Sequence, residues 1–176
     1  MIFLPTPLPG VWRVELEPLE DERGLFARSW CRQAFLERGL SGDLVQCNLS
    51  WNRKRGTLRG LHWQEAPHGE IKLVRCIRGS IWDVVVDLRR DSPCYGRWHA
   101  VELDAGSRRG LYIPEGLAHG FQTLSDDTEV FYQMSTSYVP EAARGIRWND
   151  PAFGIAWPLP NEVILSERDA SFPDYR

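Results

Sequence analysis

A stretch of alternating side chains at residues 71–88 constrains the fold more than any other part of the chain. Successive side chains of a β-strand point to opposite faces of a sheet, so this pattern predicts strands. Gly79 gives a turn signal that makes the stretch a predicted hairpin. Lys72 then shares its face with two small apolar residues, and Asp83 and Asp87 share theirs with apolar neighbours. The two acidic side chains either face water on a half-buried sheet or belong to a site, and position alone does not choose.

Short segments of the same kind recur along the chain, separated by turns rich in Pro, Gly and Asp. The further predicted strands are residues 11–16, as an edge strand, and 25–30, 44–50, 98–103 and 129–135. Helices are predicted only at 32–38, ended by Gly39, and from residue 166 near the C-terminus. This pattern predicts an all-β fold, a jelly-roll sandwich or barrel, with residues 1–176 as a single domain.

The composition excludes several classes of protein. With 43% hydrophobic and 26% charged residues, the chain is an ordinary globular protein and not a disordered one. No segment is long and apolar enough to span a bilayer and no signal pattern opens the chain, so we expect a cytoplasmic protein without a membrane partner. A net charge of -3 gives no basic surface for nucleic acid. The four Cys form no CxxC pair, so neither a zinc site nor a disulfide framework is expected.

Two His-containing turns, in residues 60–79 and 114–119, are typical of a cupin-type jelly roll with its site at the barrel mouth. Metal-binding cupins place a His-x-His pair in the first motif, whereas this chain reads His62-Trp63-Gln64. Only His62 and His119 remain as nitrogen ligands, with Glu70 a weak third. The sequence therefore predicts no metal site.

Three side chains fit a proton transfer without metal. Removing a proton from a carbon beside a ketone requires a base, a positive group at the developing enolate oxygen and an acid for the opposite face. His62 suits the base, a role worth roughly 10² to 10⁴ in rate. Lys72 in a partly apolar wall suits the enolate, and Tyr132 on a predicted strand suits the acid. The set resembles that of an epimerase.

Gln46, Asn48 and Ser50 share one face of the predicted strand at 44–50. Three polar side chains on one face either contact solvent or line a pocket with hydrogen-bonding groups, and parity leaves both open.

Eight motifs, in order and over nearly the whole chain, make the sequence similar to the dTDP-4-dehydrorhamnose 3,5-epimerase family. The motifs are residues 21–26, 59–64, 72–74, 83–89, 92–93, 113–121, 148–151 and 165–169. The resemblance implies a cupin without metal or cofactor that acts on a nucleotide-linked 4-keto-6-deoxyhexose. The implied reaction inverts C3 and C5 of dTDP-4-dehydro-6-deoxy-D-glucose to give dTDP-4-dehydro-L-rhamnose.

The resemblance also implies roles for particular residues. By position, His62 matches the general base, Asp169 the carboxylate that orients it, and Tyr132 the proton donor. Lys72 and His119 match groups near the C4 oxygen. Positions that hold the nucleotide and diphosphate are matched by Arg23, Phe26, Arg28, Gln46, Asn48, Arg59, Tyr138 and Arg168. The family is homodimeric, and the resemblance implies that Arg23 and Phe26 reach into the partner's pocket.

Three positions depart from the family pattern. Arg28 and Ala143 stand where many members carry Glu, both at the nucleotide end of the site, whereas Arg168 replaces a common Lys and keeps its charge. The departures leave the base of the nucleotide open. Epimerisation at only C3 or only C5 is an alternative. Two more remote alternatives are a metal-dependent cupin oxygenase or isomerase and a catalytically silent sugar-binding cupin.

Overall fold

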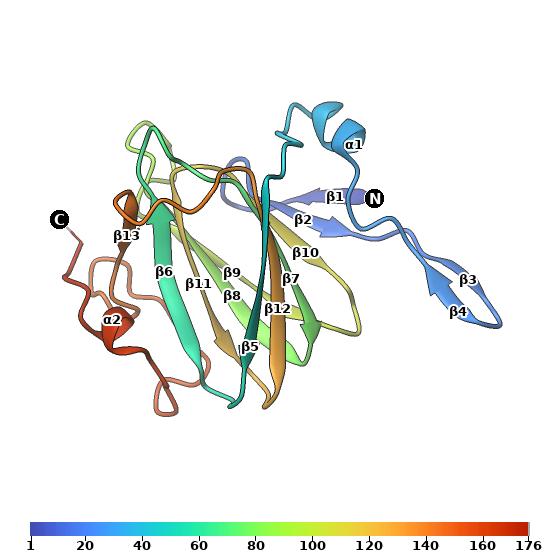
Figure 1. Ribbon diagram of the computed structural model, residues 1–176. Helices are drawn as coiled ribbons and strands as arrows, with labels where there is room; N and C mark the ends of the chain where they lie inside the picture. Colours follow the sequence, from blue (N-terminus) through green and yellow to red (C-terminus); the bar gives the residue numbers. More distant parts are fainter. Residues whose placement is uncertain (176) are drawn as a thin grey trace.

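Two antiparallel β-sheets face each other in the computed structural model, which describes residues 1–175 (Figure 1). The six-stranded sheet has the order β1 (Ile2–Pro5), β2 (Trp12–Glu15), β10 (Gly110–Ile113), β7 (Lys72–Arg78), β12 (Thr128–Met134) and β5 (Gln46–Asn52). The five-stranded sheet has the order β13 (Ala143–Gly145), β6 (Leu58–Gln64), β11 (Leu117–Thr123), β8 (Ser80–Asp87) and β9 (Trp98–Asp104). The predicted all-β, cupin-type jelly roll is confirmed.

The two strands predicted at 71–88 are present, but the prediction that they form a hairpin is wrong, because β7 and β8 do not pair with each other. The turn at Gly79 carries the chain from one sheet to the other, where β7 pairs with β10 and β12, and β8 with β9 and β11. Val74 of β7 and Val85 of β8 are completely buried in the core between the two sheets. Gly79 has φ +77, which is the left-handed region that the predicted turn requires. The alternation in the sequence thus placed one apolar set between the sheets.

Asp83 and Asp87 are both completely buried, so the possibility that they face water is excluded. The reason is that β8 lies between two other strands and both of its faces are covered, one by the core and the other by a second apolar cluster that includes Trp157. Asp87 accepts hydrogen bonds from Arg89 and Ser92 and so holds the turn after β8. Asp83 belongs to the site described below.

The N-terminal part of the chain differs from the sequence prediction in two ways. The segment at 11–16 is not an edge strand, because β1 pairs with β2 and forms the edge instead. Extended structure at 25–30 is limited to β4 (Gly24–Phe26), which pairs only with β3 (Leu19–Asp21). These two strands form an arm that projects away from the barrel (Figure 1).

Two short helices complete the fold. The first, α1 (Arg32–Leu36), is shorter than the predicted 32–38 and buries Phe35 against the outer face of the six-stranded sheet. The second, α2 (Glu167–Ala170), begins at the N-cap Ser166, whose side chain accepts a hydrogen bond from the Asp169 N–H. Between residues 1 and 175, no helix has the length and apolar character needed to cross a membrane.

Candidate active site

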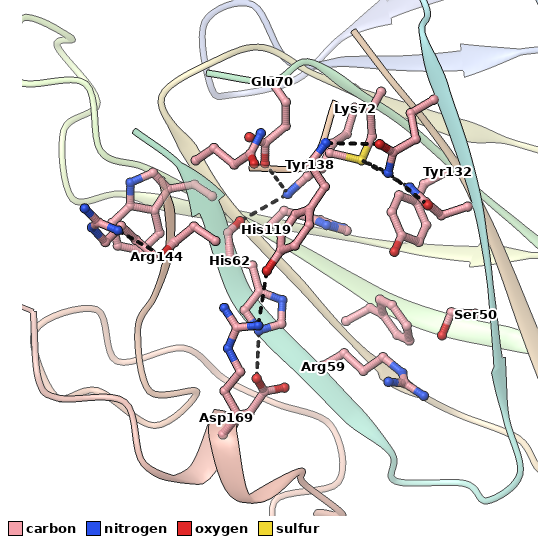
Figure 2. Close-up of a pocket in the computed structure, with 18 of the residues that line it drawn as sticks. Ser50, Arg59, His62, Glu70, Lys72, His119, Tyr132, Tyr138, Arg144 and Asp169 are labelled. Carbon is pink, nitrogen blue, oxygen red and sulfur yellow. Dashed lines mark hydrogen bonds and ion pairs between the residues drawn. The ribbon is translucent and has the colours of Figure 1, made fainter. Parts of the chain in front are cut away.

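A cavity of about 710 Å³ opens between the two sheets and is lined mainly by β5, β6, β7, β11, β12 and the start of α2 (Figure 2). Gln46, Asn48 and Ser50 of β5 all line it. Of the two possibilities left by strand parity, the pocket is therefore the correct one. β5 pairs with β12 at the edge of the six-stranded sheet, and the face that carries these three side chains is turned toward the cavity.

His62 and Asp169 form the first of two His–Asp pairs in the cavity. His62 Nε2 lies 2.7 Å from Asp169 Oδ1, although 107 residues separate them in the chain. The Gly60 N–H donates to the other carboxylate oxygen, and the Phe172 ring packs edge-on against the imidazole with ring centres 5.7 Å apart. The His62 side chain is 38% exposed, whereas that of Asp169 is 6% exposed. The carboxylate is thus fixed in the wall while the imidazole remains open to the cavity.

The environment of Asp169 keeps the carboxylate charged. Burial by itself raises its pKa, but the hydrogen bond and charge of His62, the Gly60 N–H and the charge of Arg168 act in the other direction. The net effect is a pKa below the ordinary value of an aspartate. A charged Asp169 accepts the Nε2 proton of His62, which leaves Nδ1 of the neutral ring as the acceptor.

His119 and Asp83 form the second pair. His119 is the register partner of His62 across β6 and β11, and its Nε2 lies 2.8 Å from Asp83 Oδ1. The side chains of His119 and Asp83 are 9% and 0% exposed. Of this pair, His119 lines the cavity, whereas Asp83 is buried behind it.

Lys72 enters the cavity from the first residue of β7. Its Nζ lies 2.9 Å from Glu70 Oε1 and donates to the backbone carbonyl of His62 at 3.2 Å. Both members of the ion pair are more than nine-tenths buried. Sequence reasoning considered Glu70 only as a weak metal ligand and missed its pairing with Lys72. The available signal was an acid two residues before the only lysine of the predicted strand, although Glu70 itself precedes β7.

Tyr132 reaches the cavity from β12 in the six-stranded sheet, opposite the His62 strand. Burial raises the pKa of its phenol, and the charge of Arg59 offsets part of that effect. The Tyr132 hydroxyl therefore keeps its proton at neutral pH. Arg59 itself is held by Asn52, which accepts from its Nε at 2.7 Å.

Most of the predicted nucleotide-binding residues also line the cavity. Gln46 donates to Asn48 and accepts from the Tyr138 N–H, while Arg168 donates to the Tyr138 hydroxyl at 3.5 Å. Arg59 completes this group. The lining residues that sequence reasoning did not predict include Trp63, Phe121, Met134 and Arg144. Met134 lies on a predicted strand, whereas Arg144 lies on β13 (Ala143–Gly145), which was not predicted. An aromatic or apolar side chain on a strand gives no signal that separates a pocket wall from a core.

Arg23, Phe26 and Arg28 do not line the cavity of their own chain. Arg23 and Phe26 lie on the β3–β4 arm, where Arg23 is held by Asp21 and Phe26 is 72% exposed. Arg28 follows the arm and is exposed as well. The structure thus separates these three residues from the other predicted site residues.

Among residues 1–175, no group of three or more His, Cys, Asp or Glu side chains is arranged to hold a metal ion. His62 and His119 each bind their own aspartate through Nε2.

Comparisons with known proteins agree with this fold and identify the family. The family model for dTDP-4-dehydrorhamnose 3,5-epimerase matches residues 5–176. The dTDP-4-dehydrorhamnose 3,5-epimerase of Methanothermobacter thermautotrophicus is 47% identical over 99% of this chain and 94% of its own length. The crystal structure of the enzyme of that name from Elizabethkingia anophelis superposes with a TM-score of 0.97 at 38% identity, covering 99% and 96% of the two chains.

A related activity occurs on the same fold. ChmJ, a 3'-monoepimerase from Streptomyces bikiniensis solved in complex with dTDP-quinovose, superposes with a TM-score of 0.90 at 36% identity, covering 97% of this chain and 86% of its own. Fold, cavity and relatives together define a cupin-type carbohydrate epimerase, which is an isomerase. The chain belongs to the dTDP-4-dehydrorhamnose 3,5-epimerase family.

Proposed function

We propose that the protein inverts C3 and C5 of dTDP-4-dehydro-6-deoxy-D-glucose, giving dTDP-4-dehydro-L-rhamnose. The observation that carries the proposal is the meeting of a His–Asp pair, a buried lysine and a protonated tyrosine in one cavity. Relatives named dTDP-4-dehydrorhamnose 3,5-epimerase, which match this chain over nearly their full length, support the choice of substrate. The reaction requires a proton to leave a carbon beside the C4 ketone and another to arrive on the opposite face.

His62 acts as the base and Tyr132 as the acid. Nδ1 of His62 removes the proton from C3 or C5, and the charged Asp169 stabilises the imidazolium that forms. Tyr132 then donates its proton to the same carbon. The two side chains come from opposite sheets, β6 and β12, so a sugar ring between them presents one face to each (Figure 2). Removal on one face and return on the other inverts the centre.

Lys72 stabilises the enolate. As the proton leaves, negative charge moves to the C4 oxygen, and a fixed ammonium group in a wall closed to water lowers the energy of that state. His119, held by Asp83, adds a second polar group at the same oxygen. Neither side chain has to move, because each is already fixed by a buried carboxylate.

The nucleotide and diphosphate occupy the outer part of the cavity. Arg59 and Arg168 offer forked donors suited to phosphate oxygens. Tyr138 is half exposed at the rim, with Gln46 and Asn48 beside it, and gives a flat surface for a base. Ala143 lines the same cavity and Arg28 lies outside it, so of the two departures from the family pattern only Ala143 touches this chain's own site.

We further propose a homodimer in which the β3–β4 arm enters the partner's cavity, where Arg23 and Phe26 would contact the nucleotide. Phe26 and Leu19 on the arm are 72% and 71% exposed, which is unfavourable for a free monomer. Buried Arg75 on the outer face of β7 has two nitrogens without a partner among the described residues. Light scattering tests the assembly, and Phe26→Asp is expected to weaken substrate binding and dimerisation together.

We also propose that residues 1–176 unfold as one domain and that the protein is cytoplasmic. The continuous core between the sheets supports the first statement, and a single cooperative transition in calorimetry would test it. Four cysteines without a disulfide among residues 1–175 are usual in a reducing compartment and support the second. Cell fractionation would test it.

Proton NMR in D₂O tests the reaction itself. Metal-stripped enzyme is mixed with dTDP-4-dehydro-6-deoxy-D-glucose, and deuterium is followed at C3 and C5. We expect exchange at both centres together with a changed sugar configuration. Exchange at C3 alone would make the protein a monoepimerase like ChmJ, a relative of the same fold. No exchange, with the CDP-, UDP- and GDP-linked ketosugars also silent, would refute the proposal.

A further inference from the structure

Glu70 is a buried carboxylate in the cavity wall that the proposed mechanism does not use. It is 7% exposed and lines the cavity. Its Oε1 lies 2.9 Å from the Lys72 Nζ, whereas its Oε2 is fully buried and has no hydrogen-bond partner among the described residues. A buried carboxylate oxygen without a donor is unfavourable, so a donor from outside the chain would stabilise this arrangement.

The position of Glu70 indicates which part of the substrate supplies that donor. Glu70 and Lys72 lie together on one side of the cavity, and Arg59 lies on the opposite side (Figure 2). A carboxylate repels a diphosphate, whereas arginine attracts it. The Glu70 side of the cavity therefore suits the uncharged sugar. An ionised carboxylate only accepts hydrogen bonds, so the group that meets it is a hydroxyl.

The pairing with Lys72 narrows the choice to one hydroxyl. The inference rests on the proposed function, in which Lys72 Nζ holds the C4 oxygen of a 4-keto-6-deoxyhexose. The two carbons next to C4 are C3, which carries a hydroxyl, and C5, which carries a methyl group. Glu70 Oε1 binds Nζ, so Oε2, on the same carboxylate, is placed beside a carbon next to C4. Of these two carbons only C3 carries an O–H.

We propose that Glu70 Oε2 accepts a hydrogen bond from the C3 hydroxyl of the substrate, which makes Glu70 a specificity-determining residue for 4-ketosugars hydroxylated at C3. Glu70 has a double function on this account. One oxygen fixes the Lys72 ammonium against the enolate position, and the other selects the sugar beside it. A 3-deoxy sugar would leave the buried Oε2 without its donor and would bind weakly.

Paired binding measurements test the proposal. Dissociation constants are measured by calorimetry for the 4-ketosugar nucleotide and its 3-deoxy and 2-deoxy analogues, all in a His62→Ala background so that the ligands are not turned over. We expect the 3-deoxy analogue to bind about tenfold or more weakly than the parent sugar, as for a hydrogen bond to a charged group. The 2-deoxy analogue should show no such loss that depends on Glu70.

Adding Glu70→Ala should reduce the 3-deoxy discrimination to about one, while Glu70→Gln, which keeps an acceptor oxygen and the side-chain volume, should leave it partly in place. Unchanged binding of dTDP alone would show that each variant is folded. If Glu70→Ala no longer binds dTDP, the Glu70→Gln variant provides the test instead. If its 3-deoxy discrimination were as high as in the His62→Ala background alone, the proposal would be overturned. A Glu70-dependent loss with the 2-deoxy analogue would overturn the choice of C3. Failure of the wild-type enzyme to exchange C3 or C5 protons would instead overturn the proposed function.

Discussion

The histidines of the two His–Asp pairs lie on neighbouring strands of one sheet and bind their aspartates at similar distances, 2.7 and 2.8 Å, yet the pairs differ in exposure and in the partners of the aspartate. His62 is 38% exposed and its aspartate comes from a C-terminal helix, whereas His119 is 9% exposed and its aspartate lies on the adjacent strand β8. Both oxygens of Asp169 have partners, whereas Asp83 Oδ2 has none among the described residues. A histidine that gains and loses a proton in each turnover needs access to substrate and a fully stabilised counter-charge. Only the first pair meets both conditions.

The largest effect that this difference predicts is on turnover after His62→Ala. Loss of the base should lower kcat by roughly 10² to 10⁴, because the neighbouring imidazole, that of His119, is buried and bound to Asp83 through Nε2. Binding of dTDP should persist, since Arg59 and Arg168 are untouched. Steady-state kinetics with calorimetry measures both quantities. Turnover near the wild-type level would show that the base is a different group.

Asp83→Ala should act on stability more than on chemistry. The change leaves the imidazole of His119 buried without its partner, which costs roughly 2–3 kcal/mol of the free energy of unfolding. Asp169→Ala should cost less, because His62 then turns to the open cavity. Urea unfolding of the two variants gives the comparison directly. An equal loss in both would mean that the two pairs have the same structural role.

Asp169→Asn should lower kcat by about 10- to 100-fold, the range seen when the outer partner of a metal-bound histidine is removed. The amide keeps the shape of the side chain but cannot stabilise an imidazolium. KM should change little. If kcat were unaffected by Asp169→Asn, Asp169 would have no role in the proton transfer. Glu167→Gln on the same helix is a matched control.

The smallest effect is a pH dependence of stability. The pKa of Asp169 is lower in the folded protein than the ordinary aspartate value of 3.8, so the folded state is stabilised by its ionisation above that value. This contribution is lost as the pH falls through the folded pKa. The difference in unfolding free energy between wild type and Asp169→Asn should therefore shrink from pH 5 toward pH 2. A difference that stays constant over this range would contradict the lowered pKa.

Strand parity located only one of the two aspartates, Asp83, and did not pair it with His119. The alternation in 71–88 placed Lys72 and Asp83 on the correct faces, because strand parity is a local property. It could not decide whether Asp83 was buried, since that depends on the position of β8 inside a covered sheet. Asp169 was found only through the family resemblance. Its place beside His62 results from the path of the C-terminal segment, which no local pattern specifies.

The β3–β4 arm and Glu70 show the same limit. Strand pairing at 19–26 was not predicted, because an isolated two-stranded sheet has no core to give it an apolar pattern. Glu70 was visible as an acid near a lysine, but its burial depends on the opposite wall of the cavity. Local pattern thus gave the strands and one face of each, whereas long-range packing decided which polar groups share the cavity.

Deuterium exchange in single-site variants tests the central claim, which is that the His62–Asp169 pair transfers the proton and the His119–Asp83 pair only holds the substrate oxygen. The measurement is the rate of deuterium incorporation at C3 of the ketosugar for His62→Asn and His119→Asn in D₂O. We expect exchange to fall by roughly 10² to 10⁴ with His62→Asn, and to fall much less with His119→Asn. Exchange that survives in His62→Asn and disappears in His119→Asn would contradict the account.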